Sequence, residues 1–85
     1  MQNEKFFRKN AFVKVYLDDK SGDFYWHKDI NHPYLTGLNI DVDPNFVTVN
    51  AIDHYDGEEV TLYSSRENSI ENVKDVLLKF QALCH

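Results

Sequence analysis

The last part of the chain most constrains its fold, because residues 68–83 carry apolar side chains at helical spacing. These apolar positions are Ile70, Val73, Val76, Leu77, Phe80 and Leu83. A stripe of this width needs another surface to cover it. No segment upstream has the pattern of a second long helix, so the covering surface should be a sheet. Helix-capping residues are present at the start, where either Asn68 or Ser69 can serve as the cap.

Five upstream segments have the pattern of β-strands, at residues 11–18, 24–30, 38–43, 46–52 and 58–64. Apolar and polar residues alternate with period two in most of them, which is typical of half-buried strands. Turn-forming residues such as Gly22, Pro44 and Gly57 separate the segments. Because short connections favour antiparallel neighbours, the sequence predicts an α+β fold. Its sheet should be a five-stranded, mostly antiparallel meander, covered by one C-terminal amphipathic helix.

The length of 85 residues suits one domain. Residues 1–10 form a basic, aromatic N-terminal arm, in which Phe6 and Phe7 should dock on the body or form a short strand or turn. Residues 11–85 should form a single α+β domain. An exposed edge strand could pair two copies into a homodimer.

The composition favours a cytoplasmic protein. The chain has one cysteine and therefore no disulfide framework of the kind that small secreted domains carry. Its first residues do not resemble a signal peptide. No run approaches the ~18 apolar residues of a membrane-spanning helix, so no membrane partner is expected.

Charge is unevenly distributed along the chain. The formal net charge is −5, and no Lys or Arg occurs between Asp29 and Ser65. An acidic body repels phosphate backbones and favours basic partners. It can also be a solvated surface that only keeps the protein soluble. If it is a contact surface, the residues expected to bind a protein are Asp41, Asp43, Asp53, Tyr55, Asp56, Glu58 and Glu59.

The candidate catalytic and metal patterns are weak. Residues 41–45 place oxygen ligands as a calcium loop begins, but the later Gly and Glu positions of such a loop are missing. His54 lies beside Asp53 in a turn, and no pair of His or Cys has the spacing of a preformed zinc site. Ser64 and Ser65 lack a nucleophile-elbow pattern. We therefore expect a protein that is not an enzyme and needs no metal or cofactor.

A second interpretation is a single-stranded RNA or DNA binder. Aromatic residues interleaved with lysines in the first hairpin resemble a base-stacking platform, and the N-terminal arm could add phosphate contacts. The residues concerned are Lys5, Arg8, Lys9, Phe12, Lys14, Tyr16, Tyr25, Trp26 and Lys28. The same aromatics could instead be the core of the sheet.

The favoured expectation is a small acidic binding protein whose acidic face docks on a basic surface of a partner protein. A nuclease or another nucleic-acid-handling enzyme would offer such a surface. An inhibitor, an antitoxin or an immunity-like protein would act in this way, and so would a phage-encoded anti-defence protein.

Overall fold

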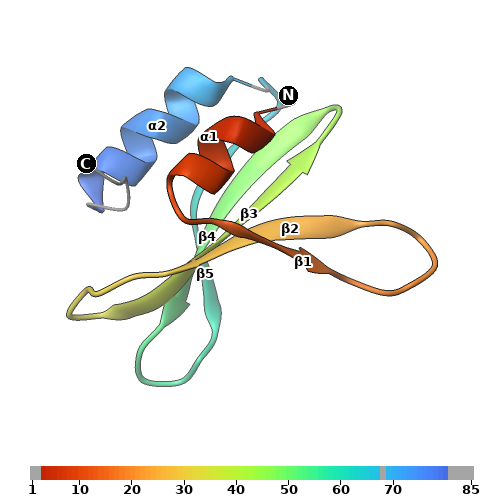
Figure 1. Ribbon diagram of the computed structural model, residues 1–85. Helices are drawn as coiled ribbons and strands as arrows, with labels where there is room; N and C mark the ends of the chain where they lie inside the picture. Colours follow the sequence, from red (N-terminus) through yellow and green to blue (C-terminus); the bar gives the residue numbers. More distant parts are fainter. Residues whose placement is uncertain (1–2, 68, 81–85) are drawn as a thin grey trace.

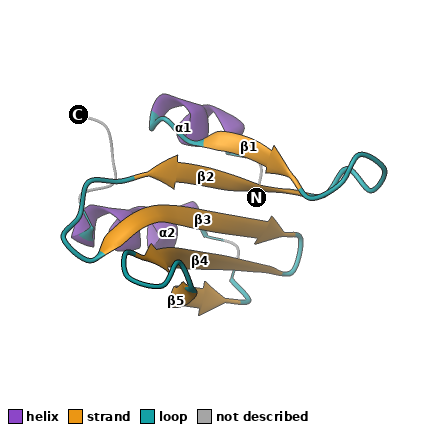
Figure 2. Cartoon of the chain, turned by 90° about the horizontal axis from the view of Figure 1, so that it is seen from below, coloured by secondary structure: helices purple, strands orange, loops and turns teal. Residues whose placement is uncertain are grey.

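The computed structural model describes residues 3–67 and 69–80, and it has the predicted α+β architecture. Its elements are α1 (Glu4–Lys9), β1 (Val13–Tyr16), β2 (Phe24–Asp29), β3 (Leu35–Asp43), β4 (Phe46–Asp53), β5 (Glu59–Ser65) and α2 (Ile70–Lys79). The strands form one antiparallel five-stranded sheet in the order β1-β2-β3-β4-β5. Both helices lie on the same side of this sheet (Figures 1 and 2). The predicted meander with a C-terminal helix is therefore confirmed.

The strand register separates a covered face, which lies under the helices, from an open face. On the covered face Ile40 pairs with Val49 and Leu38 with Ala51, and all four side chains are buried. The neighbours of these residues along each strand point the other way. The open face therefore carries polar side chains such as Asn39, which lies opposite Asn50. Such a division is usual for an antiparallel sheet with one solvated side.

The second helix covers the centre of the sheet with part of the predicted stripe. Val73 and Leu77 are fully buried, while Ile70, Val76 and Phe80 are half-buried. The helix runs over Ile70–Lys79. Leu83 and the predicted cap Asn68 lie outside the described residues. Ser69 holds the N-cap position, without a side-chain hydrogen bond to the helix.

The N-terminal arm forms a short helix, which the sequence did not predict. The chain leaves α1 through a Schellman motif, in which Phe12 N donates to Phe7 O at 2.9 Å and Ala11 N to Arg8 O at 3.2 Å. The rings of Phe7 and Phe12 meet edge to face, as the apolar contact of this motif requires. The arm is thus folded back on the sheet as a helix, instead of forming a strand or a turn.

Ala11 should respond measurably to replacement by glycine. It is the C′ residue of the Schellman motif and has φ 67°, which costs a residue with a Cβ atom about 1–2 kcal/mol. We expect Ala11→Gly to raise the free energy of unfolding by about 1 kcal/mol, after the extra flexibility of the unfolded chain is offset. Urea denaturation followed by Trp26 fluorescence measures the change. The control is Ala51→Gly, in the middle of β4, which should instead destabilise the fold. Equal losses of stability in both variants would show that the backbone of Ala11 is not strained.

The aromatic side of the first hairpin belongs to the core. Phe12 and Trp26 are 2% and 4% exposed, whereas Val13 and Leu17 are largely exposed. The reason is α1, whose Phe7 ring stacks on Trp26 at a centroid distance of 5.0 Å. Farther along the sheet, Tyr63 pairs with Val49 on the covered face and is half-buried.

The two edges of the sheet are β1 and β5. The predicted edge-to-edge homodimer would therefore use one of these two strands. Within the described residues, neither helix is long and apolar enough to cross a membrane.

Candidate acidic protein-binding face

The open face of the sheet carries acidic residues and no lysine or arginine. By register its acids are Asp29, Asp41, Asp43 and Glu59. All nine Lys and Arg of the sequence fall among the described residues, and each has another location. They lie on the helices (Lys5, Arg8, Lys9, Lys74, Lys79), on the covered face (Lys14, Lys28) or in connections (Lys20, Arg66). The cations are therefore segregated from the open face, whereas acidic residues also occur on the helices, at Glu4, Glu71 and Asp75.

A polar network crosses the centre of the open face. His27 Nδ1 lies 2.6 Å from Asn39 Oδ1, and its Nε2 lies 2.8 Å from Asp29 Oδ1. Asn39 is only 7% exposed and donates from Nδ2 to Glu59 Oε1 at 2.6 Å. These bonds link β2, β3 and β5, so the acidic residues at both ends of the network have fixed positions.

The network continues onto β4. Asn50 Nδ2 lies 3.5 Å from Glu59 Oε2, and Thr61 Oγ1 donates to Asn50 Oδ1 at 2.9 Å. Gly37 lies next to His27 in this network, and a Cβ atom added to Gly37 would be 3.0 Å from His27 Cε1. A glycine at this place leaves room for the imidazole ring of His27. The strands β2, β3, β4 and β5 thus present a hydrogen-bonded polar surface with carboxylates along it.

Asp41 carries an unfavourable charge. Partial burial, and secondly the negative charge of Glu59, raise the pKa of Asp41 above its ordinary value of 3.8. Among the described residues, no Lys or Arg forms an ion pair with either carboxylate. The free protein therefore holds two acidic groups near each other without a cation between them.

The repulsion predicts a pH-dependent effect of Asp41→Asn. Because the folded pKa is raised, the folded state binds the proton more tightly, and stability falls as pH rises from about 3.8 through the folded pKa. At pH 7 the Asn variant should be more stable by about 0.5 kcal/mol, a small value because solvent screens this partly exposed group. The gain should vanish below the ordinary pKa. Thermal melts of Asp41→Asn at pH 7 and pH 3 check this prediction, with Asp75→Asn on α2 as the control. A stability gain of Asp41→Asn that is the same at both pH values would contradict the proposed repulsion.

The predicted contact residues fall into two groups. Asp41, Asp43 and Glu59 lie on the open face, whereas Asp53, Tyr55, Asp56 and Glu58 lie at the β4–β5 connection, at one end of the sheet. There, Asp53 Oδ1 accepts a hydrogen bond from Tyr55 N and Asp56 Oδ1 accepts one from Glu58 N. These two carboxylates shape the turn and are exposed or half-exposed at its surface.

Several residues of the site were missed by sequence reasoning, namely His27, Asp29, Asn39, Asn50 and Thr61. Alternation placed Asn39 on the same side as Asp41, and Asn50 on the same side as Thr48. Recognising the network also needs the strand register. The turn after Asp43, whose carboxylate accepts a hydrogen bond from Asn45 N, fixes the β3–β4 register that sets Asn39 opposite Asn50.

The aromatic and basic residues of the predicted nucleic-acid surface do not form one open platform. Phe12 and Trp26 are buried, Tyr25 lies on the open face and Tyr16 is exposed at the hairpin edge. Three cations cover rings: Arg8 lies over Trp26, Lys14 over Phe24 and Lys28 over Phe12. Lys5 and Lys9 are exposed on α1. Phe7 of α1 stacks on Trp26, so the face of that ring is covered by the helix.

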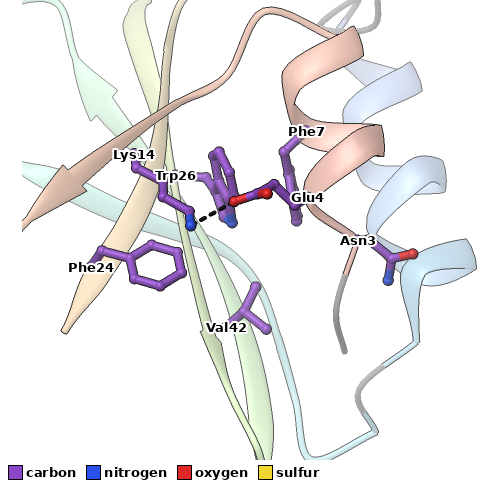
Figure 3. A pocket seen from close by; sticks show the side chains of 7 residues that line it. All are labelled: Asn3, Glu4, Phe7, Lys14, Phe24, Trp26 and Val42. Atoms are coloured by element: carbon purple, nitrogen blue, oxygen red, sulfur yellow. Dashed lines mark ion pairs between the residues drawn. The ribbon is translucent and has the colours of Figure 1, made fainter. Parts of the chain in front are cut away.

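A pocket of about 290 Å³ lies between α1 and the sheet, lined by Asn3, Glu4, Phe7, Lys14, Phe24, Trp26 and Val42. Figure 3 shows Lys14 and Glu4 pointing at each other within it, with Nζ 2.6 Å from Oε1. The hydrogen bond and then the charge of Lys14 lower the pKa of Glu4, and Arg8 adds to this effect. Because the charges of Glu4 and Lys14 neutralise each other, the pocket has no net charge, and it offers aromatic rings to a ligand.

Metal ligands do not converge in the described ranges, where no three His, Cys, Asp or Glu side chains are placed to hold an ion together. Comparison of the chain with known protein families, curated proteins and solved structures finds no match.

Proposed function

We propose that this protein is a small acidic, non-enzymatic binding protein that docks the open face of its sheet on a basic surface of a partner protein. The observation that supports this most is the absence of all nine Lys and Arg from a face that carries Asp29, Asp41, Asp43 and Glu59. An inhibitor, an antitoxin or an immunity-like protein is its most concrete form, and this includes a phage-encoded anti-defence protein. A nuclease or another nucleic-acid-handling enzyme is the proposed partner class.

The dimensions and charges suit such docking. The molecule measures 33 × 28 × 23 Å, so its broad face can supply the ~800 Å² that a standard interface buries on each partner. Acidic groups steer a basic partner and set its orientation. A cation placed between Asp41 and Glu59 would also remove their mutual repulsion, so binding would relieve a cost that the free protein bears. We place this activity in the cytoplasm, since the single cysteine offers no disulfide framework.

The test uses a fluorescein-labelled peptide of six lysines as the basic probe. The variant Asp41→Asn/Glu59→Gln removes two charges from the open face, and Glu71→Gln/Asp75→Asn removes two from α2. We expect the first to weaken binding about tenfold, which corresponds to ~1.4 kcal/mol, and the second to change it much less. Both should bind more weakly in higher salt. Equal losses in the two variants would show that only net charge matters and would reject the open face as the contact.

The alternative, binding of single-stranded RNA or DNA, has one observation in its favour. Seven of the nine cations lie on the helices or the covered face, so the side opposite the acidic face is basic. A labelled oligonucleotide should then bind in low salt and lose affinity in Lys5→Glu/Lys9→Glu, two exposed positions on α1. Absence of binding at low salt would eliminate this candidate.

A further inference from the structure

Two loops at the end of the sheet together present exposed tyrosines. Tyr34 precedes β3 and Tyr55 follows β4, and they are 66% and 86% exposed. His54 N donates to Tyr34 O at 2.9 Å, which joins the two loops. Figure 1 shows these β2–β3 and β4–β5 loops next to each other at the lower left. We call the pair of side chains, Tyr34 and Tyr55, the tyrosine end.

The backbone that carries the tyrosine end is well ordered by hydrogen bonds. Tyr55 N is held by the carboxylate of Asp53 at 2.7 Å, and Gly57 N donates to Asp53 O at 3.0 Å. Tyr34 N is held by His32 Nδ1 at 3.1 Å. Tyrosine loses little entropy when it is fixed, because it has two side-chain torsions. Large rings on fixed loops are the usual anchors of protein interfaces.

Acidic residues lie close in sequence to both tyrosines. Asp53, Asp56 and Glu58 lie in the same turn as Tyr55, and Asp29 ends the strand that leads to the loop of Tyr34. No Lys or Arg occurs from residue 29 to residue 65, and within the loops the tyrosine rings contact the histidines His32 and His54. A partner that is complementary to this end must therefore be cationic.

Among cations, arginine fits the tyrosine end better than lysine does. A guanidinium group is planar, stacks on aromatic rings and forms paired hydrogen bonds with carboxylates. An ammonium group is more strongly hydrated and has no flat face to stack. A ring beside a carboxylate therefore distinguishes the two cations, whereas a carboxylate alone attracts both.

We infer that the tyrosine end makes the docking selective for arginine over lysine on the partner surface. This inference rests on the proposed function, since it specifies the chemistry of the basic surface that the acidic face would meet. The open face supplies the general attraction, and Tyr34 and Tyr55 supply the preference for guanidinium groups.

The experiment compares labelled peptides of six arginines and six lysines by fluorescence anisotropy. Because a guanidinium group stacks on an aromatic ring better than an ammonium group does, two rings should favour the arginine peptide about fivefold. In Tyr34→Ala/Tyr55→Ala the two peptides should bind alike, with the affinity for the lysine peptide unchanged. Tyr16→Ala is the matched control, because Tyr16 is also exposed but lies at the opposite end of the sheet. It should keep the full preference, and circular dichroism confirms that each variant is folded.

The outcomes separate the inference from the proposed function. If both peptides bind the wild type equally, or if the preference survives in the Tyr34/Tyr55 variant, the tyrosine end has no such role. The same holds if Tyr16→Ala removes the preference as strongly, or if the double variant loses both peptides equally. In each of these cases the acidic-face proposal stands. If neither peptide binds the wild type, the proposed function fails and the inference fails with it.

Discussion

Replacing Phe7 by alanine should lower the free energy of unfolding by about 3–5 kcal/mol, the range for a buried phenylalanine. Phe7 is 1% exposed and is the deepest contact between α1 and the sheet. Its ring stacks on Trp26 at 5.0 Å and meets Phe12 edge to face at 5.5 Å. Without this ring the Schellman motif loses its apolar contact, and a helix of six residues cannot stay folded alone. The loss is a large part of the stability of a small domain.

Urea denaturation measures the loss, and the position of the fluorescence maximum tests its location. The only tryptophan, Trp26, lies directly under the Phe7 ring, so its emission should move to longer wavelength in the native state of Phe7→Ala. The control is Phe46→Ala, a 41% exposed ring on β4 that should cost much less and leave the emission unchanged. A loss below ~1 kcal/mol for Phe7→Ala would mean that α1 does not cover the hairpin.

Leu77→Ala should have the second largest effect, about 2–5 kcal/mol. Leu77 is fully buried, and with Val73 it anchors α2 over the centre of the sheet. Truncation removes apolar contact and leaves a cavity between α2 and the strands, because strands held by their register cannot close the space. The result should be a lower urea midpoint with a nearly unchanged denaturant slope.

The neighbouring Leu78 provides the control for this substitution. It has the same side chain on the same helix but is 55% exposed, so Leu78→Ala should change stability by about 0.5 kcal/mol or less. Trp26 emission should stay the same in both variants, unlike in Phe7→Ala, because α2 covers a different part of the sheet. Similar losses at positions 77 and 78 would contradict the docking of α2 through Leu77.

The elements that sequence reasoning predicted are those with a clear periodicity. Period-two alternation in β3 and β4 and the helical stripe of α2 identified the layers and the meander. The helix α1 was missed because six residues are too few for a periodic signal and because its end uses Ala11 at positive φ, where glycine is expected. For the same reason the sequence could not decide whether the aromatic residues of the first hairpin are core or surface, since it is α1 that covers them.

In the candidate site, too, some residues could be predicted from periodicity and others could not. Alternation and the missing cations alone could assign Asp41, Asp43 and Glu59 to one acidic side of the sheet, where the structure places them. The link from His27 through Asn39 to Glu59 could not, because it joins residues on three strands and depends on register. Likewise, Tyr34 and Tyr55 are 21 positions apart in the sequence, and it is the pairing of Leu35 with Asp53 and the hydrogen bond from His54 N to Tyr34 O that bring their loops together.

The segregation of charge is tested most directly by mapping a basic ligand on the protein with nuclear magnetic resonance. In a titration of ¹⁵N-labelled protein with the peptide of six arginines, the largest amide shift changes should fall on the open face and the adjacent turn. The expected positions are Asn39, Asp41, Asn50, Glu59 and Tyr55, while the signals of Val73 and Leu77, which are buried residues of α2, should not move. Shift changes that are spread evenly over both sides, or that centre on the acidic residues of α2, would contradict the open face as the binding surface.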